Sequence, residues 1–445
     1  MKPTSSHSKR LPQFQISPDG EGVINHVGSI ALRELTDVLG LTTALSSVMA
    51  QSRRRRSAHD PGKVLRDLVV MLADGGDCVS DLGALREQPE VFGEVASTST
   101  AWRVVEGISA EDLDGLREAR RQARERAWRR GAGPREIVLD LDATLVLAHS
   151  EKEQAASNYK RGFGFHPVLC YLDESEEALS GILRRGNATA NDSADNIEVL
   201  ELALKQLPKS KRPRRILARA DSSGATHAFI DRLREHGIQF SVGMDFYEVV
   251  KEAILNTPEA SWRPAITQEG DQREGAWVCE LSQLELSSWP SGTRAICRRE
   301  RPHPGAQLKF TDHQGFRFQV FITDQTDADI AILEARHRGH ARVENRIRCA
   351  KDTGLRNFPF HDFHANQVWL ELVLAAQDLI AFFQRLCLRG QARGWEPKRL
   401  RYRLLHTAAR LVHTGRRSIL KLQRNWQWTL MLYDAFRRLR KLAAV

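Results

Sequence analysis

Cysteines are few, and no pattern ties them together. The chain of 445 residues has six of them, and no two form a Cys-x2-Cys pair. This spacing fits neither a zinc site nor a disulfide framework, so we expect a reduced protein in the cytoplasm. The six are Cys78, Cys170, Cys279, Cys297, Cys349 and Cys387.

Long apolar segments are also missing. The stretch from Met1 to Gln13 is polar and lacks the apolar run of a secretory signal, so we expect no leader of that kind. The most apolar long stretch, residues 368–383, contains Glu371 and Asp378, which favours a buried helix over a membrane span. The sequence therefore predicts no membrane partner.

Acidic residues become scarce toward the C-terminus. Residues 388–445 hold fifteen Lys or Arg and only two acids, a local net of +13, so the total of +10 leaves −3 for residues 1–387. A slightly acidic body with a strongly basic end favours a polyanionic partner, most simply nucleic acid. A solvated helical surface is the alternative, and charge alone does not decide between the two.

Hydrophobic periodicity divides the chain into helical and mixed regions. Residues 29–108 have helical spacing, interrupted by the basic run Arg53–Arg56, and residues 117–130 form a basic helix that ends at Gly131. The next segments predict an α/β unit with mixed strand directions. Its predicted elements are strands at 137–146, 165–172 and 179–183, a helix at 192–207, a strand at 215–220, a helix at 226–236 and a strand at 238–242.

Carboxylates mark two of these strands. Asp140 and Asp142 lie on the same side of the first strand because side chains alternate. Carboxylates in an apolar strand are costly to bury unless they are paired or bind metal. A half-exposed edge strand is the alternative. Asp221 ends the fourth strand, at the carboxyl edge where α/β sheets usually hold ligands, although Asp is also common in turns.

A third carboxylate lies on a predicted helix within residues 327–350, and residues 363–388 are predicted to continue helically. Spacings of three, four and seven place His337, His340, Glu344, Arg348 and Lys351 on one stripe. An exposed helix with an ion pair between Glu344 and Arg348 is the alternative interpretation. Three acids beside a basic stripe are the layout of a ribonuclease-H-like nucleotidyl-transfer site. Two Mg²⁺ ions held there would serve in-line displacement at phosphorus.

These motifs resemble those of bacterial insertion-sequence transposases of the DDE type, in the group with a Tyr-x2-Arg-x3-Glu-x6-Lys third motif. Asp142-Ala143-Thr144 is similar to the first motif, Asp221 to the second, and Glu344 with Lys351 to the third. The Tyr and Arg positions of that motif are His337 and His340 here. Further similar stretches are Tyr159–Pro167, Gly186–Ala190 and Gly75–Arg103.

The resemblance implies a DNA transposase that cuts at insertion-sequence ends and joins the 3′-hydroxyl to target DNA, a cut-and-paste route. Its catalytic and metal residues would be Asp142, Asp221 and Glu344, with Asp140 as the substitute for Asp142. The implied cofactor is a pair of Mg²⁺ ions, for which Mn²⁺ is an expected substitute. The partners would be double-stranded DNA, as terminal inverted repeats and target, and a second copy of the chain on paired ends. The expected DNA contacts are Lys351, Arg348, Arg338, His340 and His337.

About 120 residues separate Asp221 from Glu344, which is too long for one loop. In similar transposases a strand-rich insertion fills this gap, and an aromatic side chain in it stacks on a flipped base. Trp262, Trp277 or Trp289 could do so here, although each is individually more typical of a core.

The fold class we predict is an α/β ribonuclease-H-like core with a strand-rich insertion, a helical N-terminal region and a basic helical C-terminal region. The cellular location that follows is cytoplasmic, at the nucleoid. The predicted domains are a loose leader (1–28), a helical DNA-binding domain (29–130), the first part of the core (131–246), the strand-rich insertion (247–326), the second part of the core with the catalytic Glu (327–388) and the basic helical C-terminal region (389–445).

Two other functions stay open at this stage. The run from Ile137 to Val146 also fits a haloacid-dehalogenase-like phosphatase, with Asp140 as nucleophile and Asp142 as acid and base. That hypothesis leaves the Glu344 helix and the basic end unexplained. A non-catalytic DNA-binding relative is the second alternative, and the three acids argue against it.

Overall fold

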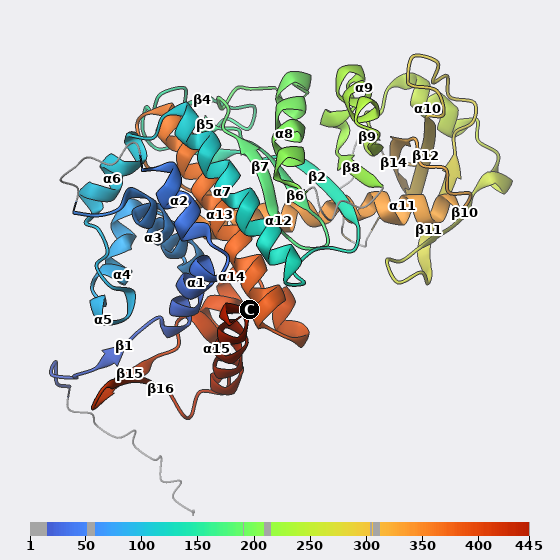
Figure 1. The fold of residues 1–445 in the computed structure, drawn as a ribbon. Helices are drawn as coiled ribbons and strands as arrows, with labels where there is room; N and C mark the ends of the chain where they lie inside the picture. The colour runs from blue at the N-terminus through green and yellow to red at the C-terminus, as the bar shows by residue number, and fades with distance from the viewer. Residues whose placement is uncertain are drawn as a thin grey trace, which may run out of the picture.

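A mixed β-sheet runs through the centre of the molecule (Figure 1). The computed structural model describes residues 16–50, 58–189, 191–208, 215–302, 305 and 312–444, so the leader up to residue 15 and the basic run Arg53–Arg56 lie outside it. Within the described residues, ten strands form this sheet, in the order β10-β11-β12-β14-β9-β8-β2-β6-β7, with β13 paired to β14.

Five strands between residues 137 and 244 form the middle and one end of the sheet. The order β7-β6-β2 is antiparallel throughout, whereas β8 and β9 run parallel to β2. This confirms the predicted mixed directions. The strands are β2 (Ile137–Ala143), β6 (Val168–Leu172), β7 (Ala178–Ile182), β8 (Ile216–Ala220) and β9 (Gln239–Met244).

The first predicted strand, at 137–146, is divided in two. Its central-sheet part, β2, ends at Ala143, and β3 (Val146–Leu147) pairs instead with β5 (Phe163–Phe165) in a small sheet that includes β4 (Ala156–Ser157). The chain turns between Ala143 and Val146, so the residues after Asp142 leave the central sheet at its edge.

The inserted strands extend the same central sheet. β14 pairs antiparallel with β9, and β12, β11 and β10 follow outward. Figure 1 shows the insertion at the end of the sheet remote from the N-terminal helices. Its elements are α10 (Glu248–Leu255), β10 (Arg263–Ile266), β11 (Gln272–Glu280), β12 (Arg294–Glu300), β13 (Asp312–His313) and β14 (Phe316–Thr323).

Helices cover both faces of the sheet. The buried residues Ile137, Leu139 and Leu141 of β2 pack in one core with residues of α8 (Ser193–Gln206) and α9 (His227–Glu235). The other face meets α11 (Ile330–Arg338) and α12 (Arg342–Ala350), which are joined by the short helix η5 (Gly339–Ala341). Because side chains alternate along β2, Asp140 and Asp142 project toward this second face.

The helix predicted at 363–388 is α13 (Phe363–Cys387), and it is buried over most of its length. No helix among the described residues is long and apolar enough for a bilayer crossing. The helices that precede the central sheet share a hydrophobic core with α13. They are α1 (Val27–Val38), α2 (Leu41–Val48), α3 (Pro61–Asp74), η1 (Val79–Leu82), α4 (Gly83–Arg86), α5 (Pro89–Phe92), α6 (Thr98–Glu106) and α7 (Ala110–Arg129).

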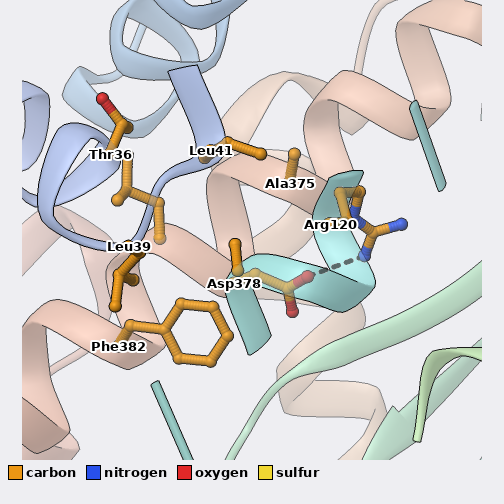
Figure 2. A pocket seen from close by; sticks show the side chains of 9 residues that line it. Thr36, Leu39, Leu41, Arg120, Ala375, Asp378 and Phe382 are labelled. Atoms are coloured by element: carbon orange, nitrogen blue, oxygen red, sulfur yellow. Dashed lines mark hydrogen bonds and ion pairs between the residues drawn. The ribbon is translucent and has the colours of Figure 1, made fainter. Parts of the chain in front are cut away.

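Buried ion pairs join α7 to α13, which lie side by side in Figure 1. Arg120 donates to Asp378 at 2.8 Å and also binds Glu371, and all three side chains are buried. Figure 2 shows Arg120 and Asp378 facing each other beneath the apolar side chains that line a small pocket between these helices, α1 and α2. Breaking a pair of this kind leaves an uncompensated buried charge, so Arg120 holds the two helices together.

The C-terminal region differs from the prediction of a basic helical segment. It contains a β-hairpin of β15 (Ala409–Thr414) and β16 (Arg417–Leu422), to which β1 (Val23–Ile24) adds a third strand. Alternation explains this structure: Ala409 and Leu411 are buried, and exposed Arg410 lies between them. Its remaining helices are η7 (Gly390–Gly394), α14 (Pro397–Leu400), η8 (Arg401–Leu405) and α15 (Thr429–Ala443).

Candidate active site

Asp142 and Asp221 lie at neighbouring strand ends. β2 and β8 are parallel, and their register aligns Leu141 with Ala220, so the next residue on each strand is one of the two acids. The backbone N–H of Ala143 donates to Asp142 Oδ1 at 2.7 Å. The predicted carboxyl edge therefore does bring these two carboxylates side by side.

Asp221 is held by the turn that follows β8. It caps the short helix η3 (Ser222–Gly224) and accepts hydrogen bonds from the backbone N–H of Ser223 at 3.0 Å and from the Ser223 hydroxyl. Asp221 is exposed, whereas Asp142 is half-buried. One carboxylate is thus open to solvent and the other is partly withdrawn into the protein.

Glu344 approaches from α12 on the second face. The short helix η5 begins at Gly339, and the missing side chain there allows close packing, because a Cβ on Gly339 would lie 2.5 Å from Arg219 Nη1. His340, in η5, makes a hydrogen bond from Nδ1 to Asp140 Oδ1 at 2.9 Å. This contact ties the segment that precedes α12 to β2, and Glu344 lies exposed in the first turn of α12.

The pKa of Asp142 is raised by its surroundings. Burial, together with the negative charges of Asp221 and Glu344, raises this pKa to about 6, while His340 and the Ala143 hydrogen bond oppose the rise. Like charges raise a carboxyl pKa only at short range. The charges of Asp221 and Glu344 therefore both act on Asp142.

Asp140, the substitute candidate, has different surroundings. It is buried and makes a two-point ion pair with Arg219, whose Nε and Nη2 each donate at 2.7 Å. Arg219 also contacts Asp173 at 2.9 Å and donates to the carbonyl of Arg336 at 2.6 Å. Arg342, at the start of α12, pairs with Asp173 as well. This network anchors β2, β8 and the α11–α12 segment to one another.

Lys351 lies on the other side of the acids. Its Nζ donates to the carbonyl of Leu145 at 3.0 Å, in the turn that leaves β2. Burial lowers its pKa, and the cations Lys160 and Arg356 lower it further, while Asp142 opposes them. Lys160 belongs to the Tyr159–Pro167 segment, so a second lysine from a different segment acts on Lys351.

The other predicted DNA contacts differ in their surroundings and exposure. The His337 ring stacks on Phe321 with centroids 4.1 Å apart, Nδ1 faces Ser241 Oγ at 2.9 Å, and burial holds the His337 pKa well below its usual range. Arg338 donates to Glu334 at 3.0 Å. Arg348 is exposed and pairs with Glu396 at 2.5 Å, which replaces the Glu344–Arg348 pair of the alternative interpretation.

The three tryptophans of the insertion divide into two groups. The guanidinium of Arg299 lies 4.4 Å from the Trp262 ring and 5.2 Å from the Trp277 ring. Trp289 stacks on His227, with centroids 4.2 Å apart and an interplanar angle of 28°. His227 begins α9, shortly after the turn that holds Asp221, so Trp289 packs against the segment that follows Asp221.

The described part of the chain contains two groups of three side chains that could bind a metal ion. Within each group the ligand atoms lie within 4.8 Å of one another, and neither group includes Asp142, Asp221 or Glu344. The carboxylates of these three acids are therefore more widely spaced. The two compact groups are His26–Asp74–His406 and Asp77–Cys78–Asp81.

Sequence reasoning missed the Arg219 network, although a signal was present. Arg219 interrupts an apolar strand two residues before Asp221, just as Asp140 precedes Asp142 by two. Aligning the two strands by their acids places Asp140 opposite Arg219, which is the observed register. A charged residue inside a buried strand requires a partner, and the second acid of β2 supplies it.

Comparison with known proteins identifies the family. No curated protein matches significantly. A cryo-EM structure of the piggyBac transposase synaptic complex with hairpin DNA is similar at 11% sequence identity and a TM-score of 0.45, covering 86% of this chain and 80% of that chain. The family described as transposase DDE domain group 1 matches residues 6–444. Because this match extends over nearly the whole chain, the protein belongs to the transposase DDE domain group 1 family and is a DNA transposase.

Proposed function

We propose that this transposase cleaves DNA at the ends of an insertion sequence and joins the freed 3′-hydroxyl to target DNA by a cut-and-paste route. The observation that carries the proposal is the parallel register of β2 and β8, which places Asp142 and Asp221 at neighbouring strand ends, and the raised pKa of Asp142 is consistent with it. Family membership excludes the phosphatase alternative. Its nucleophile would have been Asp140, which is committed to Arg219.

We assign the central sheet and its helices to a ribonuclease-H-like core. The strand order β7-β6-β2-β8-β9 supports this, with the first three antiparallel and the last two parallel to β2. The catalytic carboxylates then come from the first strand, the fourth strand and a later helix. The domain boundaries predicted from the sequence are part of the same proposal.

Transposases of this type use divalent metal ions, and we propose Mg²⁺ as a pair of ions, with Mn²⁺ as a substitute. Asp142, Asp221 and Glu344 would hold them. The donor set fits: it consists of carboxylate oxygens, which hard cations prefer, and the pKa of Asp142 marks uncompensated negative charge. Bound metal would supply Lewis-acid activation of the phosphodiester.

The chain's own residues orient the DNA and fix the acids. Lys351, which is near Asp142, would attract the phosphate next to the scissile bond, with Lys160 beside Lys351, and exposed Arg348 would contact a more distant phosphate. His340 and Arg219 act through Asp140, which they hold in place beside Asp142. We assign His337 to packing against Phe321 rather than to DNA contact.

The C-terminal hairpin is our candidate for the surface that holds DNA. Its outward face carries Arg410, Arg417 and Lys421, here called the hairpin cations, and all three are exposed. None of the three forms an ion pair with a described carboxylate, and the two acids of residues 389–445, Glu396 and Asp434, pair with Arg348 and Arg437. Unpaired cations on a ribbon would contact the phosphates of terminal and target DNA.

Two further parts of the proposal concern assembly. We propose that two copies act on paired ends in the cytoplasm, at the nucleoid. We also propose Trp289 as the base-stacking residue of the insertion, because its stacking on His227 ties it to the Asp221 turn. Trp262 and Trp277 are engaged with Arg299 instead.

A strand-transfer assay tests the function. Purified protein would be incubated with Mg²⁺, a plasmid target and a labelled duplex from the DNA that flanks the coding region. We expect cleavage at the element end and joined product. A non-catalytic relative would shift the duplex in a gel without cutting it, and that result would overturn the proposal.

A further inference from the structure

Two histidines and an aspartate meet far from the catalytic acids, where the first and last parts of the chain touch. Asp74 Oδ2 lies 2.5 Å from His26 Nδ1, and Asp74 Oδ1 lies 3.2 Å from His406 Nε2. The two imidazole rings pack with centroids 4.1 Å apart. All three ligand atoms lie within 4.8 Å of one another.

Each residue is fixed by a separate backbone feature. His26 precedes α1 with a left-handed φ of 55°, an uncommon conformation for a residue with a side chain. Asp74 is the last residue of α3, and His406 ends η8. The backbone N–H of Val27 donates to the carbonyl of Thr407 at 3.1 Å, so the two histidine segments run directly against each other.

We propose that His26, Asp74 and His406 bind a Zn²⁺ ion, with water as the fourth ligand. Two imidazoles and one carboxylate are a borderline ligand set that suits Zn²⁺ and Co²⁺ better than Mg²⁺. The side chains of His26 and His406 are 31% and 37% exposed, against 5% for Asp74, which leaves room for entry and for a bound water.

The surroundings prepare these side chains as ligands. Asp74 is buried, and its carboxylate faces a ring nitrogen of each histidine, so the three side chains already converge on one point. The Ser29 hydroxyl donates to Asp74 Oδ1 at 2.5 Å and orients it. Zn²⁺ would replace the ring protons that now face this carboxylate.

The ion would fasten the hairpin to the helical body. Arg401 already holds the His406 segment on α3, since it donates to the carbonyl of Ala73 at 2.9 Å, and its charge is also satisfied by the carbonyl of Asp352 at 2.6 Å. The strands β1 and β15 pair immediately beyond the cluster. The site is therefore structural, and it is separate from cleavage chemistry.

Co²⁺ titration of the full-length Asp142→Asn protein tests the proposal, because this variant weakens metal binding at the catalytic acids. Co²⁺ with few ligands absorbs strongly in the visible range, whereas six oxygen ligands give only weak bands. We expect one strongly absorbing Co²⁺ per chain, displaced by Zn²⁺. Absence of a strong band would overturn the proposal.

Variants localise the ion. His406→Gln in the same background should weaken Co²⁺ binding by roughly tenfold or more. The matched control is His413→Gln, a hairpin histidine whose Nδ1 faces Ser418 and which lies outside the cluster, and it should keep the affinity. Cys78→Ser changes the second compact group, Asp77–Cys78–Asp81, and should also leave the Co²⁺ affinity unchanged. Unchanged binding in a folded His406→Gln protein would refute the site.

Melting temperature is the second readout, and it does not depend on the His406 variant being folded. Adding Zn²⁺ to metal-free Asp142→Asn protein should raise its melting temperature, whereas Mg²⁺ at the same concentration should not. A melting temperature that Zn²⁺ leaves unchanged would also count against the proposal.

Discussion

Replacing Asp142 by Asn should stabilise the metal-free protein, although it should abolish cleavage. Burial, Asp221 and Glu344 together raise the Asp142 pKa from 3.8 to about 6. Since each pKa unit corresponds to about 1.4 kcal/mol, the charged carboxylate costs roughly 3 kcal/mol of folding free energy at neutral pH. Asparagine carries no charge and retains an oxygen for the Ala143 N–H.

The effect should depend on pH in a defined direction. Because the folded-state pKa lies above the unfolded value, the proton on Asp142 stabilises the fold fully below about pH 4, and this contribution is lost as the pH rises through about 6. The advantage of Asp142→Asn should therefore be about 3 kcal/mol at pH 8 and about half of that at pH 5. Mg²⁺ should stabilise the wild type and so reduce the difference in unfolding free energy between Asp142→Asn and the wild type at pH 8.

Urea denaturation in EDTA, followed by circular dichroism at both pH values, measures this difference. Asp140→Asn is the matched control two residues away on the same strand, and it should destabilise the protein because it removes the two-point partner of Arg219 and leaves Asp173 as the one carboxylate of that pair network. The reasoning is refuted if Asp142→Asn is no more stable than the wild type at pH 8. A gain that is equal at both pH values would also contradict it.

Three further predictions follow from the contacts. Asp140→Asn should lower the free energy of unfolding by about 3–5 kcal/mol in urea titrations, and a smaller loss would mean that Asp173 alone balances the charge of Arg219. Changing the three hairpin cations to Gln should reduce the slope of log affinity against log salt for end DNA by about 2–3, whereas a Lys398→Gln control, which only loses its pair with Asp352, should change it little. Trp289→Ala should slow cleavage of end DNA in single-turnover assays more than Trp262→Ala does, and equal rates would remove Trp289 from the proposed stacking role.

The alternation of apolar residues was enough to predict most of the central fold. Every strand and helix expected between residues 165 and 242 exists, with ends shifted by a few residues. The regular period of Ile137, Leu139 and Leu141 also fixed which face of β2 carries the acids. The helix at 363–388 could be predicted from its long apolar run. The two acids within that run, Glu371 and Asp378, are buried and paired with Arg120 of α7.

The C-terminal hairpin was not predicted, because the many basic residues of this region were interpreted as the surface of a helical segment. Local net charge of +13 suggested a helical surface, but the alternation of Ala409 and Leu411 with Arg410 is a strand pattern, and Gly415 with φ of 57° permits the turn. Pairing with β1 depends on a contact almost 390 residues away in the chain, which no local window contains. The same limit applies to the His26–Asp74–His406 cluster.

The acids were predicted from order and spacing, but their surroundings required the structure. Asp140 and Asp142 are equivalent by periodicity, and only the two-point contact of Arg219 with Asp140 distinguishes the buried partner from the carboxylate that faces Asp221 and Glu344. Likewise, the helical stripe placed His337 with Lys351, while packing against Phe321 turned its ring into the interior.

Cleavage by Glu344→Gln protein is the most direct test of the central claim. The variant removes one charge from the acidic site, keeps the size of the side chain, and leaves the hairpin cations and the Arg219 network intact. The account predicts that it binds end DNA with nearly the affinity of the wild type and yields no cleaved or joined product with Mg²⁺ or Mn²⁺. Cleavage at the wild-type rate would contradict the assignment of Asp142, Asp221 and Glu344 as the catalytic site.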